Sequence, residues 1–299
     1  MTLRFTVTAD TAGRQLQSVC RRELRLSATQ LRKLKAEQGL LVNGSPAFSS
    51  RILAAGDQIT ALLREELPDY PPEPGELHIL YEDALMLALD KPQGIIVHPT
   101  HSRNTGTLAN AVWSYLLSEG EDGCHAVNRL DRDTGGVILF AKSAWACRLL
   151  GEALAAPDTE KTYLAAVYGV PSPPNGRIDL PIRRPDPRDL RREAGEPGDP
   201  AATEYSLLES AAGCSLVQLR LLTGRTHQIR VHMSAMGWPL LGDRLYATPE
   251  SAARSAELGQ TVQALHCTDL SFLHPLTGTA LHFQSRPDWT KLKFFSFLS

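Results

Sequence analysis

Charged side chains of both signs crowd into one short segment that lies between apolar stretches. Residues 125–136 read HAVNRLDRDTGG, so two arginines and two aspartates fall within residues 129–133. On an exposed turn such a cluster forms local ion pairs of little energetic value. Here the apolar run GVILFA (136–141) follows directly, and a carboxylate beside a buried strand is partly desolvated. The pattern therefore favours a functional aspartate over a solvated turn.

A second candidate segment, GRTHQIRVH (224–232), opens a helix that we expect over residues 226–236. Arg225, His227 and Gln228 would lie in or beside its first turn. A cation at a helix N-terminus opposes the helix dipole unless an anion faces it. We therefore expect a carboxylate or a phosphate opposite Arg225, the alternative being an ordinary surface arginine.

Several other kinds of site are not indicated. Nine histidines are present, but no cysteine or paired carboxylate completes a tetrahedral metal set with them. The phosphate-binding patterns GxGxxG and GxxxxGK[ST] and the hydrolase pattern GxSxG do not occur. We expect neither a metal nor a cofactor. Five scattered cysteines and the absence of a long apolar run favour a globular protein of the reducing cytoplasm, without a membrane span.

The first 63 residues differ in charge from the rest of the chain. They hold nine basic and four acidic side chains, a net charge of +5, whereas the whole chain carries -2. Two helices are expected within residues 13–38, the second starting at a Ser27–Gln30 capping box, followed by a hairpin at Asn43-Gly44 and a strand at 57–63. We expect a small basic domain over residues 1–63, and its local charge permits binding to a nucleic acid although the net charge of the whole chain does not suggest it.

Residues 64–76 are rich in proline and acidic groups, so we expect a linker there and a larger domain over residues 77–299. In that domain three helices are expected, at 107–118, 143–154 and 226–236, and a loop at 183–200. The expected strands are 77–83, 85–90, 94–99, 136–141, 161–169, 203–209, 214–222 and a pair within 264–283. Strands cluster with few helices between them, which predicts an α+β fold with a mixed, mostly antiparallel sheet.

Taken together, these segments resemble the RluA-type pseudouridine synthase family. The resemblance rests on NRLDRDTGG (128–136), KTYLAAVYG (161–169), GRTHQIRVHMSAMGWPLLGDRLYA (224–247), LHCTDLSFLHPLTG (265–278) and LDKPQGIIVHPT (89–100), which follow one another in the order of the family. Residues 13–63 resemble the RNA-binding domain named after a ribosomal small-subunit protein. The resemblance implies an enzyme that isomerises uridine to pseudouridine in structured RNA, either rRNA or tRNA, without a cofactor.

The resemblance also assigns roles to residues. Asp131 matches the catalytic aspartate, Arg225 an arginine that pairs with it, and Tyr163 a tyrosine placed against the target base. Leu265 matches an apolar residue of the pocket. Contacts to RNA are expected from Arg129 and Asn128 in the larger domain and from the basic side chains Arg21, Arg22, Arg25, Arg32 and Lys33 in the smaller one.

The sequence departs from the family at two positions. Asn128 stands where histidine is usual, and Gly135 replaces a usual serine. The intact Asp131, Arg225 and Tyr163 argue against the alternative of a non-catalytic RNA-binding factor. A hydrolase using Asp131 with His227 or His125 is a further alternative. We expect the protein to be a monomer.

Overall fold

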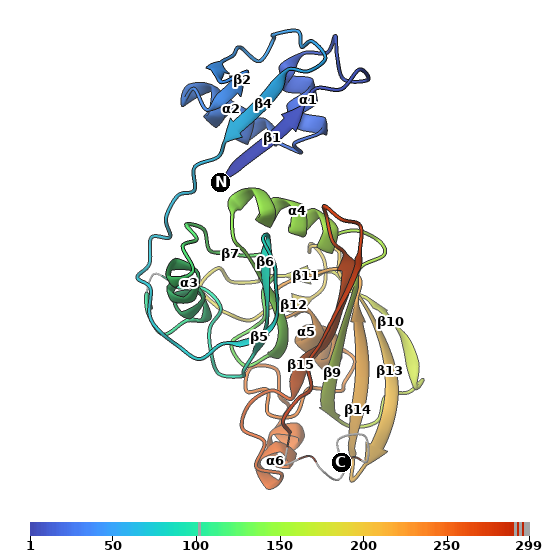
Figure 1. Ribbon diagram of the computed structural model, residues 1–299. Helices are drawn as coiled ribbons and strands as arrows, with labels where there is room; N and C mark the ends of the chain where they lie inside the picture. The colour runs from blue at the N-terminus through green and yellow to red at the C-terminus, as the bar shows by residue number, and fades with distance from the viewer. Residues whose placement is uncertain (101–102, 290–291, 293–294, 296–299) are drawn as a thin grey trace. The chain divides into compact units, whose positions relative to one another are not determined.

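The computed structural model describes residues 1–100, 103–289, 292 and 295. The chain forms two compact units (Figure 1), one made of Met1–Leu67 with Ser143–Trp145 and the other of Pro68–Lys142 with Ala146–Ser299. The division at Leu67 falls inside the predicted linker, 64–76. The rest of this linker packs on the larger unit. The buried side chain of Asn110 donates to Pro71 O at 2.8 Å and so holds the linker against this unit.

In the smaller unit two short helices accompany a four-stranded sheet. The helices are α1 (Leu16–Arg22) and α2 (Ala28–Ala36), and the strand order is β1 (Thr2–Thr6), β4 (Gln58–Leu62), β2 (Leu40–Val42), β3 (Ser45–Pro46). The predicted capping box of Ser27 and Gln30 is present. Asn43 and Gly44 both have positive φ, as the hairpin turn between β2 and β3 requires. Strand β1 was not predicted from the sequence.

A single mixed sheet organises the larger unit, and it confirms the predicted α+β class. Its order is β10 (Asn175–Asp179), β13 (Ala202–Ala211), β14 (Cys214–Leu221), β9 (Glu160–Tyr168), β15 (Leu265–Leu273), β8 (Gly135–Ala141), β6 (Met86–Lys91), β5 (His78–Glu82). β16 (Ala280–Gln284) pairs with β15, and β7 (His125–Ala126) with β8. Among the described pairs only β15 with β8 is parallel. β13, β14, β9 and β15 lie side by side in Figure 1.

Four helices and a small ribbon complete this unit. They are α3 (Leu108–Ser118), α4 (Ala144–Leu154), α5 (Gln228–Ala235), α6 (Pro249–Glu257) and the pair β11 (Ile182–Arg183) with β12 (Glu193–Ala194). One face of β9 and β14 packs into a core that includes Leu164, Leu216 and Trp289. Val231 of α5 packs with Ile182, so the ribbon is tied to the helix.

Three predictions of local structure need correction. Residues 94–99 form no strand, because Gly94 turns the chain with φ 90° and the carbonyls of Ile96 and Val97 accept hydrogen bonds from the first turn of α3. The predicted loop 183–200 is not wholly irregular, because β12 (Glu193–Ala194) inside it pairs with β11 (Ile182–Arg183). Helix α5 begins at Gln228, not at residue 226, because His227 adopts a left-handed backbone with φ 59°.

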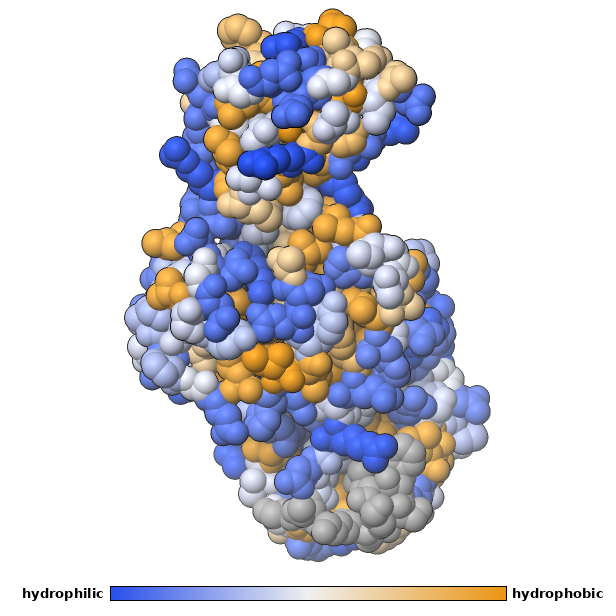
Figure 2. All heavy atoms as spheres, in the orientation of Figure 1, coloured by the Kyte–Doolittle hydropathy of each residue, from blue (hydrophilic) through white to orange (hydrophobic). Residues whose placement is uncertain are grey.

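Hydrophobic and hydrophilic side chains are interspersed on the surface of the protein. On the face seen in Figure 2, hydrophobic residues occur in small groups separated by hydrophilic ones. Exposed apolar side chains in any case occur on ordinary protein surfaces. Within the described part of the chain, no helix is both long and apolar enough to cross a membrane.

Candidate active site

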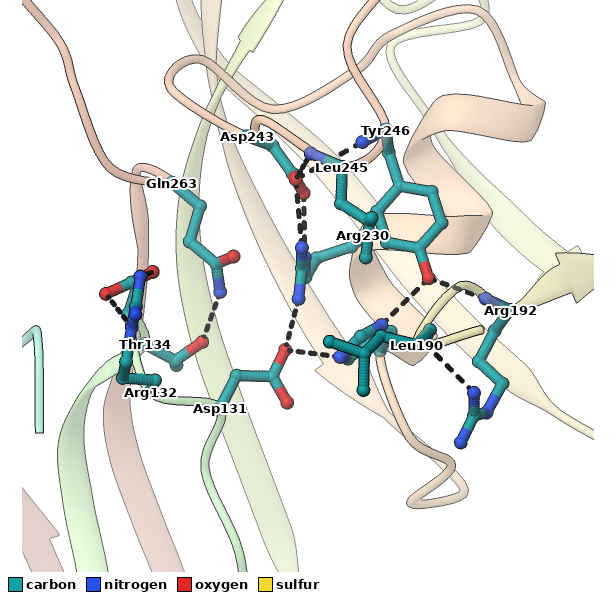
Figure 3. Close-up of polar contacts among 12 residues, drawn as sticks. Asp131, Arg132, Thr134, Leu190, Arg192, Arg230, Asp243, Leu245, Tyr246 and Gln263 are labelled. Carbon is teal, nitrogen blue, oxygen red and sulfur yellow. Dashed lines mark hydrogen bonds and ion pairs between the residues drawn. The ribbon is translucent and has the colours of Figure 1, made fainter. Parts of the chain in front are cut away.

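Asp131 lies in the loop before β8 and is held by a buried arginine. Arg230 Nη1 donates to Asp131 Oδ2 at 3.0 Å, while Arg230 Nε and Nη2 donate to the two carboxylate oxygens of Asp243 at 2.7 and 2.9 Å (Figure 3). The side chain of Asp131 is 27% exposed, that of Arg230 9% and that of Asp243 1%. One guanidinium therefore joins a buried carboxylate to a carboxylate that solvent or substrate can reach.

Arg230 is fixed by its helix and by the turn that carries Asp243. It lies in the first turn of α5, and Asp243 Oδ1 also accepts from the backbone N–H of Leu245 and of Tyr246. Burial by itself lowers the pKa of Arg230, but the hydrogen bonds and charge of Asp243, followed by those of Asp131, outweigh it and raise the pKa. The guanidinium is thus a permanent cation beside Asp131.

The predicted pairing of Arg225 with Asp131 is wrong in this structure. Arg225 is exposed, and its Nε donates to Pro200 O at 3.1 Å. The two arginines diverge because Arg225 lies before the left-handed residue His227 and turns to Pro200, whereas Arg230 lies in the first turn of α5 and faces Asp131. The anion expected opposite Arg225 is therefore a wrong prediction as well, since the carboxylate of Asp131 faces Arg230 and the Arg225 guanidinium donates to a carbonyl oxygen.

His227 and Tyr246 form a second layer around the ion pair. His227 Nε2 lies 3.9 Å from Asp131 Oδ2, and its Nδ1 lies 2.8 Å from Tyr246 Oη. The same hydroxyl accepts from the backbone N–H of Arg192 at 2.8 Å, and the Tyr246 ring lies 5.0 Å from the Arg230 guanidinium carbon (Figure 3). Burial lowers the pKa of His227, and the charge of Asp131 only partly opposes this. His227 is therefore a neutral neighbour of Asp131 at neutral pH.

The loop that carries Asp131 is braced from β6 and from the segment before β15. Lys91 is fully buried and donates to Pro92 O and Arg132 O, each at 2.9 Å. Gln93 donates to Asp133 O, and Gln263 donates to Thr134 Oγ1, both at 2.8 Å. Burial lowers the pKa of Lys91 to about 8 against the opposing charges of Asp133 and Asp131. These bonds hold the backbone on both sides of the aspartate.

Tyr163 and Leu265 lie on one face of the sheet. Tyr163 pairs with Cys267 across β9 and β15, and Leu265 pairs with Ala165 two residues along, so their side chains point to the same side. Both are buried, at 7% and 4% exposed. Burial raises the pKa of Tyr163 well above its usual value, helped by the hydrogen-bonded Cys267 thiol and the charge of Asp131. The tyrosine is therefore protonated and close to Asp131.

The two departures from the family pattern have structural explanations. Asn128 Oδ1 accepts the backbone N–H of Leu139 in β8 at 2.8 Å, which ties the start of the loop to the sheet. At Gly135 a Cβ atom would lie 2.7 Å from His266 Nδ1, so serine would need this ring to move. Arg129, beside these residues, is exposed.

The basic residues predicted to bind RNA in the smaller unit lie mostly on its surface. Arg21 and Arg22 are exposed in the last turn of α1, and Arg32 is exposed on α2. Lys33 is already paired with Glu66 at 2.8 Å. Arg25 is partly exposed with φ 51°.

Sequence reasoning missed Arg230, Asp243, Tyr246 and Lys91 as site residues. Arg230 and Asp243 both lie inside one segment that carried the resemblance, residues 224–247, so two charged side chains of opposite sign were available there as a signal. Lys91 stands in LDKP, where only Asp90 separates it from an apolar run, and a lysine at the end of a buried strand suggests a buried partner. Among the described residues, no group of three or more histidine, cysteine or carboxylate side chains could hold a metal ion.

Comparison with known proteins agrees with this arrangement. A sequence profile described as RNA pseudouridylate synthase matches residues 86–235. The chain is 37% identical over 270 residues to an uncharacterised RNA pseudouridine synthase of Bacillus subtilis, covering 89% of this chain and 87% of that protein. It is also 37% identical over 290 residues to the ribosomal large subunit pseudouridine synthase D of Xanthomonas campestris, covering 92% and 86%.

A solved structure shares the fold. The human RNA pseudouridylate synthase domain containing 1 superposes with a TM-score of 0.58 at 25% identity, covering 76% of this chain and 89% of that one. Both kinds of comparison point to the family that the five sequence segments resemble. The chain therefore belongs to the RNA pseudouridine synthase family, a family of isomerases, as its sequence resemblance indicated.

Proposed function

We propose that this enzyme converts a uridine of a structured RNA to pseudouridine with Asp131 as its catalytic carboxylate and without a cofactor. The observation that carries the proposal is the chain of contacts from buried Asp243 through Arg230 to the more accessible Asp131. Arg230 orients one oxygen of Asp131, Oδ2, and leaves Oδ1 available to a bound nucleotide. A fixed carboxylate on an accessible loop is the group that this reaction requires.

The reaction is a rearrangement within one nucleotide. The bond between ribose C1′ and ring N1 breaks, a bond between C1′ and ring C5 forms, and the proton on C5 is lost while N1 gains one. Atoms and electrons balance without an oxidant, a reductant or a transferred group. Asp131 can act by attack on C1′, by attack on the uracil ring or by proton abstraction.

Tyr163 is proposed to contact the detached base. Because its pKa is raised, the phenol is protonated at neutral pH and can donate a proton or a hydrogen bond, but it is not a base in the resting enzyme. Leu265, on the same face, would give the base an apolar surface. A pocket that retains uracil while it turns requires such a mixture of apolar walls and few polar groups.

RNA is proposed to bind through both units. The smaller unit supplies exposed arginines on α1 and α2, and phosphate contacts of this kind make affinity depend on salt. The name of the Xanthomonas relative points to ribosomal large-subunit RNA as the first substrate to examine. Arg129, exposed and two residues before Asp131, is proposed to contact the strand beside the target nucleotide.

The proposal is tested by mapping pseudouridine across all RNA from cells with and without the gene. At least one uridine should lose its modification in the deletion strain. The site should return with a wild-type copy of the gene and stay unmodified with Asp131→Asn, which keeps the size of the side chain but cannot act as an anion. Full modification with the Asp131→Asn copy would overturn the role of this residue. An unchanged map in the deletion strain would overturn the proposed function.

A further inference from the structure

A pocket of about 480 Å³ adjoins the proposed active site in the larger unit. Its wall is built from Asn128, Lys161, the end of β14 with Thr223 and Gly224, and the end of α4 with the turn that follows. Three of these segments continue into the catalytic groups. Asn128 stands three residues before Asp131, Lys161 two residues before Tyr163, and Gly224 six residues before Arg230. Lys161 and Tyr163 are two residues apart in β9, so their side chains leave the same face of the sheet and the pocket lies on the face that carries Tyr163, although Asp131, Tyr163 and Arg230 do not line it.

One wall of the pocket carries a positive charge that no carboxylate neutralises among the described residues. Lys161 Nζ donates to the carbonyl oxygen of Leu154 at 2.8 Å. An ammonium group has three N–H donors, so two remain for a ligand. Burial lowers the pKa of Lys161, an effect that a bound anion would reverse. Arg220, at the rim, is by contrast shared between Glu160 and Glu204.

The rest of the wall is suited to a planar group. Leu154, Ala155, Pro157, Leu221 and Leu222 provide apolar surface. The amide of Asn128 uses its oxygen to accept from Leu139, which leaves its NH₂ group to donate to a ligand. A volume of this size lies within the range of small-molecule sites, roughly 300–1,000 Å³. The pocket therefore combines an anion-binding group, a hydrogen-bond donor and apolar walls.

We propose that this pocket binds a nucleotide next to the target uridine, with its phosphate at Lys161 and its base against the apolar wall beside Asn128. The inference rests on the proposed function, because only an RNA substrate brings such a nucleotide to this place. Extruding a uridine into an active site breaks the stacking of its neighbours. A neighbour that is bound after it unstacks cannot restack and close the strand over the site. The pocket thus helps to keep the target uridine extruded.

Two substitutions act on the pocket and spare the catalytic groups. Ala155→Trp fills it from an exposed position of the wall, and Lys161→Met removes the charge but keeps the length of the side chain. Ala253→Trp on the exposed surface of α6 is the matched control. Each protein is tested with a transcript that contains the mapped uridine, by single-turnover pseudouridine formation over a range of enzyme concentrations. Thermal unfolding of each variant reports its folding.

We expect Ala155→Trp and Lys161→Met to raise the half-saturating concentration about tenfold or more, because the first removes the apolar contact with the base and the second the charged hydrogen bond to the phosphate. The rate at saturation should stay within about threefold, and Ala253→Trp should match the wild type. A second set of transcripts carries an abasic nucleotide at one position on either side of the uridine. At one of these positions the abasic nucleotide should weaken binding of the transcript to the wild-type enzyme. The same abasic nucleotide should not weaken binding to Ala155→Trp any further.

The outcomes separate the inference from the proposed function. A wild type that forms no pseudouridine in any transcript refutes the proposed function, and the inference falls with it. An active wild type whose half-saturating concentration is unchanged in folded Ala155→Trp refutes the inference alone. The inference is also refuted if, at every abasic position, the loss of affinity caused by the abasic nucleotide is the same in Ala155→Trp as in the wild type. The pocket would then hold none of those nucleotides.

Discussion

The most informative perturbation is Arg230→Lys, because it keeps a cation at the site but removes the geometry. Lysine has a single charged nitrogen and cannot reach Asp131 and both oxygens of Asp243 together, as the guanidinium does at 2.7 to 3.0 Å. Buried Asp243 is the closer partner, with two of the three bonds, so we expect the ammonium to stay with it. Asp131 then loses its oriented hydrogen bond.

The size of the effect follows from that bond. A hydrogen bond between charged groups contributes roughly 1.5–3 kcal/mol, which corresponds to a factor of about 10–150 in rate if Asp131 must be oriented in the transition state. We therefore expect Arg230→Lys to lower the single-turnover rate about 100-fold. In Arg230→Met the free energy of unfolding should also fall by about 3–5 kcal/mol, because Asp243 would be buried without a counter-charge.

The matched control is Arg225→Ala in the same segment. Arg225 is exposed and donates to Pro200 O, not to Asp131, so its loss should change the rate at saturating enzyme less than about threefold. Pseudouridine formation is followed by carbodiimide labelling of one transcript, with thermal unfolding measured in parallel. A folded Arg230→Lys enzyme that keeps half of the wild-type rate while Arg225→Ala loses most of it would refute this account.

Three further predictions concern residues around the site. Tyr246→Phe should lower kcat/KM about tenfold, because the hydroxyl loses its hydrogen bonds with His227 and Arg192. Tyr246→Leu should lower kcat/KM further, because the aromatic ring against the Arg230 guanidinium is lost as well. Equal values of kcat/KM for the two variants would contradict this. Asn128→His should cost less than about tenfold in turnover, since neutral histidine can accept the same backbone N–H, whereas Asn128→Ala should cost more; single-turnover kinetics of both decide it. Burial lowers the pKa of His266 from 6.5 to about 4, so the unfolded chain takes up a proton that the folded one does not, and about 3 kcal/mol of stability should be lost as the pH falls from 6.5 to 4. Urea unfolding of His266→Gln across this range should lack that part of the loss, and an identical pH dependence in both proteins would show that His266 is not responsible.

The sequence was sufficient where local patterns determine the structure. The capping box at Ser27, the turn at Asn43-Gly44 and the neighbouring strands β6 and β8 follow from short-range rules and are present in the structure. Strand β1 was missed although its residues, TLRFT, alternate polar and apolar side chains as a strand does; its partner β4 lies more than 50 residues further on. Local propensity and long-range pairing therefore agree for this strand.

The error over Arg225 has a different origin. Both arginines of GRTHQIR were visible, but the pattern alone does not show which one faces Asp131, because the left-handed backbone of His227 separates Arg225 from the helix that carries Arg230. The partner Asp243 lies 13 residues further on, in a turn that only the folded chain places beside α5. Helix boundaries and long-range partners are the parts that sequence patterns determine least.

The place of β15 in the sheet has a consequence for how the chain can fold during synthesis. This strand pairs with β9 on one side and, in parallel, with β8 on the other. A ribosome-bound chain that has not yet reached residue 265 therefore holds two half-sheets, each with an unpaired strand edge open to other chains. Completing the sheet also brings in Leu265 and Gln263, so the proposed active site closes at the same late step. A shortened chain without β15 should aggregate before it could show any residual catalysis.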